Sequence, residues 1–194
     1  MGTILFLIFF PMIIALILLV AKSDAARGAI VKIAALLIAA CSIVVAVQYF
    51  KSGGEYFAVH YEAINYIMMG IEVLLALYIV IVGIKHKKYL ASLFAILQTP
   101  LMIVFEFTKG HGVEVKYNMY VDRLSIIMIL IIGIIGSLIT VYALGYMKDF
   151  QHHHADQKDR RPWFFFVMFL FLGAMVGLVT SNNIIWMYFF WEIT

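Results

Sequence analysis

Long apolar segments separated by short polar connections dominate this chain. Seven can be marked: Ile4 to Ala21, Ala29 to Phe50, Ile64 to Ile84, Tyr89 to Phe107, Tyr120 to Met147, Trp163 to Thr180, and Ile184 onward. The first six have about 18 residues or more, the length that an α-helix needs to cross the hydrocarbon of a bilayer. None shows the alternating polarity of a spanning strand. The pattern predicts an all-α, polytopic transmembrane bundle of about seven segments, the last one incomplete.

Local signals suggest where several of these helices begin. Asp122, followed by Ser125, and the pair Asn182 and Asn183 are good N-cap residues, and Pro162 suits a first helical turn. Pro11 and Pro100 fall inside spans, where neighbouring helices can satisfy the freed carbonyls. Five glycines, one pair of which forms a GxxxG motif, predict close helix approach: Gly133, Gly136, Gly145, Gly173 and Gly177.

The two ends of the chain differ in character. Met1 to Val20 lacks the basic start and the small-residue cleavage site of a secretory signal, so we expect a first spanning helix there. From Ile184 to Thr194 a helix would rise about 16 Å, roughly half of a span. We therefore expect the structure to continue beyond Thr194, either in the same polypeptide or in a partner chain of a split subunit.

Composition agrees with a membrane protein and narrows its chemistry. The chain is 65% hydrophobic and 13% charged, with a mean hydropathy of +1.02. No clustered basic face is present, which argues against nucleic acid as a partner. Cys41 is the single cysteine, so this chain holds no cysteine-ligated iron–sulfur cluster and no CxxC zinc site.

Basic residues in the connections predict the orientation. The connections after the first, third and fifth segments hold Lys22, Arg27, Lys85, Lys87, Lys88, Lys148, Lys158, Arg160 and Arg161, whereas the opposite set holds Lys51, Lys109 and Lys116. Because positive charge is retained in the cytoplasm, we expect the N-terminus to lie outside.

Glu192 is the leading candidate for chemistry. It lies eight residues past Ile184, or about 12 Å along a helix, which is near the middle of the bilayer. Burial there disfavours the charged carboxylate and a nearby lysine would favour it, so a group balanced between the two can load and release a proton. The alternative is a protonated glutamate that forms a hydrogen bond between helices.

Glu72 is a second intramembrane carboxylate. Helical spacing puts it on one face with Asn65, Met68 and Ala76. It predicts either a second proton or ion site or an interhelical hydrogen bond.

Two other polar groups favour simpler interpretations. Glu106 comes at the end of its segment and is expected to reach the interface. His152, His153, His154 and Asp156 carry the donor atoms for zinc, but adjacent residues do not all point at one ion, so a solvated loop is expected.

Several motifs together resemble the antiporter-like subunits of respiratory complex I, which are related to subunits of membrane-bound hydrogenases and of Mrp-type cation/proton antiporters. They are the segments Tyr120 to Met128, Tyr142 to Met147 and Phe164 to Phe169, the turn Ser181 to Asn183, and the pair Trp191–Glu192. The similarity covers residues 120–194 and, more weakly, residues 1–50.

That resemblance implies a proton path of discontinuous helices in which Glu192 is the functional glutamate and couples to a lysine on a later helix. Residues 64–107 look like an extra helical hairpin within the single membrane domain 1–194, so Glu72 has no family counterpart. Arg123 stands where the family commonly has glycine. An insertion of two helices preserves the orientation of the helices after it.

The resemblance predicts a proton-translocating, non-redox subunit in the plasma membrane of a prokaryote. It would lie among lipid, other membrane subunits and a peripheral redox arm that carries the iron–sulfur clusters and a flavin or nickel–iron site. A subunit of a Na⁺/H⁺ antiporter without a redox partner is the alternative. A membrane scaffold without transport chemistry is a third interpretation.

Overall fold

The computed structural model describes residues 1–21, 23–59, 62–108, 116–154 and 158–194. It divides into two compact units, Met1–Phe57 with Tyr117–Thr194, and Ala58–Lys116. In the described residues, five helices are long and apolar enough to cross a membrane, and two further apolar helices, Tyr89–Phe105 and Ile184–Ile193, are shorter. The predicted all-α class is confirmed, and the seven predicted segments fall on these seven described helices, of which five are long and apolar enough to span a membrane.

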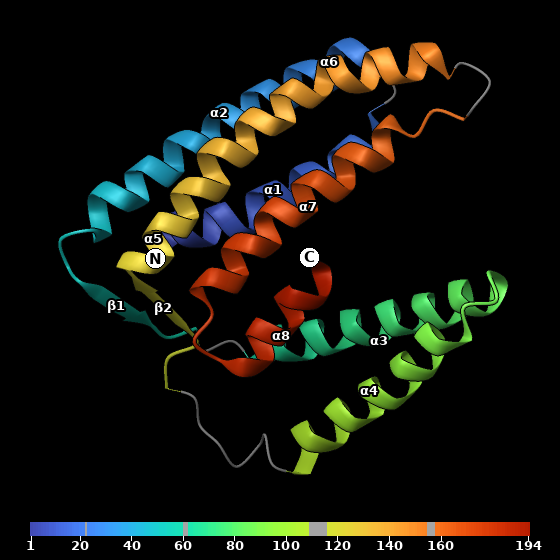
Figure 1. The fold of residues 1–194 in the computed structure, drawn as a ribbon. Helices are drawn as coiled ribbons and strands as arrows, with labels where there is room; N and C mark the ends of the chain where they lie inside the picture. Colours follow the sequence, from blue (N-terminus) through green and yellow to red (C-terminus); the bar gives the residue numbers. More distant parts are fainter. Residues whose placement is uncertain (22, 60–61, 109–115, 155–157) are drawn as a thin grey trace. The chain divides into compact units, whose positions relative to one another are not determined.

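The first unit is built around paired long helices, namely α1 (Gly2–Val20), α2 (Asp24–Tyr49), α6 (Ser137–His153) and α7 (Arg161–Thr180). Helix α1 lies along α7 and α2 lies along α6 (Figure 1). Leu7, Ala15 and Leu18 of α1 are completely buried. The N-terminal segment is therefore an integral part of the packed core.

Glycines on α7 allow its two neighbours to come close. A Cβ added at Gly173 would lie 2.5 Å from the backbone oxygen of Ile8 in α1, and one at Gly177 would lie 2.5 Å from the ring of Phe190. A Cβ at Gly133 or at Gly136 would come closer still, to the side chains of Ser42 and Leu172 respectively. A Cβ at Gly145 would meet nothing within 4 Å, so the prediction of close approach is wrong for that residue.

The fifth predicted segment, Tyr120 to Met147, differs from the structure at both ends. Strand β2 (Met119–Asp122) precedes helix α5 (Arg123–Leu130), which continues through the π-helical turn η2 (Ile131–Gly136) into α6. Met119 and Val121 are buried while their neighbours are half-exposed, an alternation that hydropathy alone does not separate from a helix. Asp122 is the N-cap, as predicted, and accepts a 2.7 Å hydrogen bond from the Ser125 amide.

A small two-stranded sheet closes one end of this unit, which we call the strand end. Strand β1 (Gly54–Phe57) pairs antiparallel with β2, and Phe57 is the partner of Met119. The turn after α7 is attached to this sheet, because the backbone N–H of Asn182 donates a 2.8 Å hydrogen bond to the backbone carbonyl of Asn118. This sheet, absent from the all-α prediction, ties three connections together.

Charged side chains tie the opposite end, which we call the ion-pair end. Arg161 at the start of α7 bonds Asp159 and also Asp24 at the start of α2, in each case at 2.8 Å. Asp24 in turn pairs with Arg27, which is 3% exposed. The connections after α1 and α6 therefore lie on one side, as the alternation of the predicted spans requires.

The second unit holds α3 (Glu62–Lys85) and α4 (Tyr89–Thr108), close to the predicted spans. A Schellman motif ends α3, since Lys88 donates to the Gly83 carbonyl and Lys87 to that of Ile84, with Lys87 at a φ of 57°. The Ser92 hydroxyl donates to the Val80 carbonyl at 3.3 Å and crowds Gly83. The two helices thus pack closely beside their turn.

Gly173 provides a test of the close approach to α1. Replacing it with alanine places a methyl group against the Ile8 carbonyl, so we expect a loss of about 1–3 kcal/mol in stability, as for overpacked cores. Thermal unfolding of the purified protein in detergent measures it. Gly145→Ala is the matched control and should be neutral or stabilising by up to about 1 kcal/mol. Equal effects of the two changes would contradict the packing.

Asp159 makes the ion-pair end sensitive to acid. Hydrogen bonds from the Arg161 guanidinium hold the pKa of this carboxyl below its ordinary value of 3.8. The contribution of the Asp159–Arg161 ion pair to the stability of the fold is therefore present at neutral pH and is lost as the pH falls through the lowered pKa of Asp159. We expect Asp159→Asn to lower the unfolding temperature by roughly 1–4 °C at pH 7, a small effect because the pair is partly exposed, and to have a smaller effect at pH 3, which is below the ordinary pKa of the carboxyl. A decrease of equal size at both pH values would exclude the ion pair as its cause; Asp149→Asn on α6 is the control.

Candidate proton-handling site

Helix α8 (Ile184–Ile193) carries Glu192 and is positioned by its own start. The Asn183 side chain accepts a 2.9 Å hydrogen bond from the Ile185 amide, which confirms the predicted N-cap. Trp186, Phe189 and Phe190 are buried, and Phe190 lies on Gly177 of α7. Helix α8 is therefore folded back along α7 (Figure 1), and its buried aromatic side chains face inward.

Glu192 lies on the other side of α8, next to Tyr188. The Tyr188 hydroxyl donates a hydrogen bond to Oε1 of Glu192, one helical turn away. Tyr188 is half-buried and Glu192 is exposed at the surface of this unit. The site thus consists of a carboxylate with a phenolic donor, open on the side that faces away from α7.

Tyr188 is a member of the site that the sequence alone does not single out. The signal that could have found it is its spacing from Glu192, because residues four apart on a helix lie one above the other. Among the many aromatic residues of this chain, nothing else in the sequence distinguishes it.

Glu72 occupies the middle of α3 in the second unit and is half-buried. Of the residues predicted to share its face, Met68 is 5% exposed and Ala76 is half-buried, whereas Asn65 is exposed. Glu72 and Glu192 belong to different units, so each is a separate candidate. Whether Glu72 handles protons stays a prediction.

The three histidines end helix α6. The imidazole Nδ1 of His153 lies 2.8 Å from the Asp149 carbonyl, and that of His154 lies 3.1 Å from the Phe150 carbonyl. Each of these rings binds its own helix, and no group of three or more metal-ligating side chains forms among the described residues. Asp156 and the side chain of Glu106 lie outside the described part of the chain.

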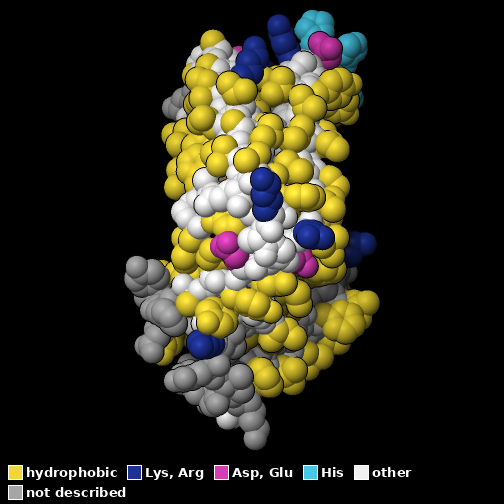
Figure 2. Space-filling model, turned by 90° about the vertical axis from the view of Figure 1, so that its left-hand side faces the viewer, with side chains coloured by type: hydrophobic (Ala, Val, Ile, Leu, Met, Phe, Trp, Pro, Cys, Tyr) yellow, Lys and Arg dark blue, Asp and Glu magenta, His cyan; other side chains and the backbone are white. Residues whose placement is uncertain are grey.

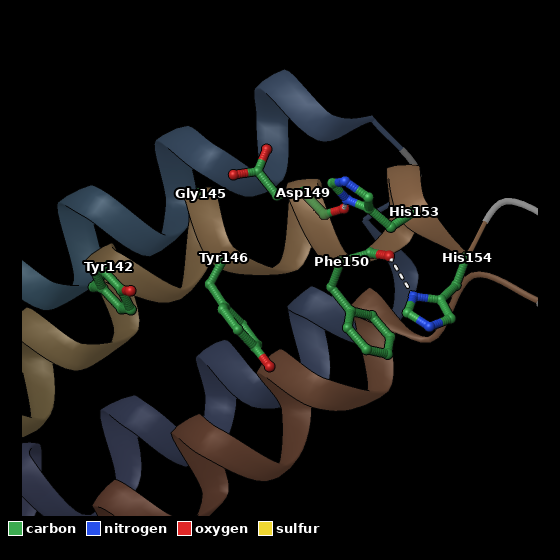
Figure 3. Close-up of a pocket in the computed structure, with 7 residues that line it drawn as sticks. All are labelled: Tyr142, Gly145, Tyr146, Asp149, Phe150, His153 and His154. Atoms are coloured by element: carbon green, nitrogen blue, oxygen red, sulfur yellow. Dashed lines mark hydrogen bonds between the residues drawn. The ribbon is translucent and has the colours of Figure 1, made fainter.

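A shallow cavity of about 510 Å³ follows the same end of α6. Figure 3 shows its lining, which consists of Tyr142, Gly145, Tyr146, Asp149, Phe150, His153 and His154. Rings stack along it, with centroids 6.3 Å apart for Tyr146 and Phe150 and 4.5 Å apart for Phe150 and His154. Exposed aromatic rings at the end of a membrane-length helix are typical of an interfacial belt.

The surface of the chain is also consistent with a position in a membrane. Hydrophobic side chains cover much of the face shown in Figure 2; the histidine side chains in view lie at one end, whereas Lys and Arg side chains appear both at that end and along the face. Helices α1 and α2 each bury only 33% of their most apolar window. Such a surface is suited to lipid and to neighbouring membrane helices.

Comparisons with known proteins agree with the motifs. Residues 107–165 match the family described as NADH-Ubiquinone oxidoreductase (complex I), chain 5 N-terminus. The Na⁺/H⁺ antiporter subunit A1 of Staphylococcus haemolyticus is 32% identical over 106 residues, which are 55% of this chain and 12% of that protein. The subunit of the same name from Staphylococcus aureus (strain bovine RF122 / ET3-1) is 35% identical over 79 residues, 41% of this chain and 9% of that protein.

The chain thus combines membrane-length helices with a region that is similar to antiporter-like membrane subunits. More particularly, the chain carries part of the complex I chain 5 N-terminal domain and is homologous to these Na⁺/H⁺ antiporter subunits, so the predicted resemblance is confirmed. The matched segments make up about an eighth or less of the length of these relatives. The relatives are therefore much longer than the region that they share with this chain.

Replacing Tyr188 with phenylalanine tests the pairing on α8. The ring and its packing remain, while the carboxylate loses a hydrogen-bond donor. We expect the rate of ion transport to fall by roughly fivefold, the effect of losing one hydrogen bond of about 1 kcal/mol, with little change in stability. Tyr142→Phe, on the exposed surface of α6, is the control. An unchanged transport rate for Tyr188→Phe would separate Tyr188 from the function of Glu192.

Proposed function

We propose that this chain forms part of the ion path of an antiporter-like subunit that exchanges Na⁺ for protons, with Glu192 as the group that takes up and releases the proton. The similarity to named Na⁺/H⁺ antiporter subunits carries this proposal. Those relatives favour the antiporter alternative over a subunit of a redox complex.

The surroundings of Glu192 support this role. Helix α8 is largely apolar from Ile184 to Trp191, and the Glu192 carboxylate projects from the surface of α8 that is not packed on α7. An intramembrane carboxylate faces protein or a water-filled path, because exposure to lipid is unfavourable. The basic partner that the family resemblance implies would come from a later helix or from another chain.

The second candidate function is that of a proton-translocating, non-redox subunit of an oxidoreductase. The description of the matched family, a chain of NADH-ubiquinone oxidoreductase, favours it. In that case the iron–sulfur clusters and the flavin or nickel–iron site reside in partner subunits. Glu192, with Glu72 as a possible second proton site, would have the same role under either function.

Glu192→Gln tests the proton site in the assembled complex. The amide keeps the shape of the side chain but does not ionise at neutral pH, so we expect coupled ion movement to be abolished. Proton uptake and release by inverted membrane vesicles after addition of Na⁺ measures it. Glu55→Gln, the same change in strand β1, should retain the activity of the parent. Proton movement that persists in Glu192→Gln would overturn the assignment.

The same vesicles distinguish the two functions. A Na⁺/H⁺ antiporter responds to a Na⁺ gradient without any electron donor. A redox-driven subunit moves protons only while the complex oxidises its donor, and it copurifies with subunits that hold iron–sulfur clusters.

A further inference from the structure

The cavity near the end of α6 is a groove between two rows of side chains on one helix. Residues four apart along a helix form a ridge, and a groove runs between neighbouring ridges. The two ridges here are Tyr146, Phe150 and His154, and Gly145, Asp149 and His153. In Figure 3, Phe150 and His154 project to one side of α6, and Asp149 and His153 project to the other. All the lining residues come from α6, so this helix alone sets the shape of what we call the α6 groove.

The two ridges differ in height. The first is a stack of rings, in which the Phe150 centroid lies 6.3 Å from that of Tyr146 and 4.5 Å from that of His154. The second ridge begins with Gly145, where an added Cβ would meet nothing within 4 Å. The groove therefore has an apolar wall of rings beside a low floor, which leaves room for a slender apolar chain.

The end of the groove nearer the ion-pair end of the unit carries a negative charge. The Asp149 carboxylate is exposed and forms neither an ion pair nor a side-chain hydrogen bond in the part of the chain that the structure describes. Of the described residues that line the groove, none is a lysine or an arginine. The charge of the groove is therefore complementary to a cation.

The two histidines add hydrogen-bond acceptors at the same end. Nδ1 of His153 and Nδ1 of His154 each lie against a backbone carbonyl of α6. Because a carbonyl oxygen only accepts, Nδ1 carries the proton, and Nε2 of the neutral ring is an acceptor. A carboxylate, imidazole acceptors and the faces of aromatic rings are the groups that bind an ammonium ion.

The length of the groove fits a lipid. From Gly145 to His154 a helix rises about 13 Å, close to half of the roughly 30 Å of hydrocarbon in a bilayer. The groove also changes from apolar to polar along this length, as a phospholipid does from its acyl chains to its headgroup.

We propose that the α6 groove binds a phospholipid whose headgroup carries a primary ammonium, with the ammonium at Asp149 and His153 and an acyl chain beside Gly145 and Tyr146. A primary ammonium has three N–H donors for these acceptors. A quaternary ammonium has none, and an anionic headgroup is repelled by Asp149. This role goes beyond ion transport by Glu192 and does not depend on it.

Photolabelling of the assembled complex tests the choice of headgroup. The complex is reconstituted in phosphatidylcholine vesicles that contain a trace of a lipid with a diazirine on one acyl chain and an ethanolamine, choline or glycerol headgroup. We expect the ethanolamine lipid to label residues 145–154 about threefold more than either of the other lipids, the effect of one exposed ion pair. Equal labelling by the three lipids, or preference for another headgroup, would overturn the proposal.

Three variants on α6 locate the interaction. Asp149→Asn removes the charge and Gly145→Leu fills the floor, so we expect both to reduce labelling by the ethanolamine lipid to the level of the choline lipid. Lys148→Gln, a change beside the groove but outside its lining, is the control and should keep the labelling of the parent. All three positions are exposed, so the thermal midpoint in detergent without lipid should not fall. Loss of labelling in Lys148→Gln but not in Asp149→Asn would assign the site to the phosphate and overturn the proposal.

A photoreactive side chain tests what occupies the groove in the native membrane. Benzoylphenylalanine replaces Tyr146, so that an aromatic ring remains in the wall, and the complex is irradiated before purification. We expect an adduct whose mass is that of a phospholipid with a primary amine. A protein product, whether from another subunit or from another segment of this chain, or a lipid without an amine, would overturn the proposal. The readout is bound lipid, so a failure here leaves the role of Glu192 in transport untouched.

Discussion

The close approach of α7 to its two neighbours is the contact on which the rest of the first unit depends. Gly173 lets the backbone of α1 reach α7, and one turn further along Gly177 receives the ring of Phe190. Since Phe190 fixes the rotation of α8, it also determines that Tyr188 and Glu192 point away from α7. Because these two glycines have no side chains, α1 and α8 can pack closely on α7, and this packing leaves the Glu192 carboxylate on the surface of the unit.

Polar contacts at the two ends hold this packing in register. At the strand end, Asn182 joins the turn before α8 to the residue preceding β2, and at the other end Arg161 joins α7 to α2. Both contacts link segments that are distant in sequence, and both lie where a long helix begins or ends. The apolar surfaces between them supply area but little specificity, because lipid tails are as apolar as the side chains that they contact.

Hydropathy and capping rules predicted much of this fold. The helices, the caps at Asp122 and Asn183 and the position of Pro162 follow from local composition and local hydrogen bonding. The β1–β2 pairing does not, since Phe57 and Met119 are far apart in sequence and each strand has only four residues. Glu192 could be singled out because a charge in an apolar run is rare. Tyr188 could not, because its role depends on which face of α8 is turned outward.

The pairing of α1 with α7 also sets an order of events during synthesis. At about 5–20 residues per second, the ribosome completes Gly173 roughly 10–30 s after Ile8, its neighbour in the folded chain. Throughout that interval α1 resides in the bilayer without its principal partner. Its mean hydropathy of 3.1, against 2.3 for α7, suits a helix that must be stable in lipid alone, while the later helix can enter against a surface already in place.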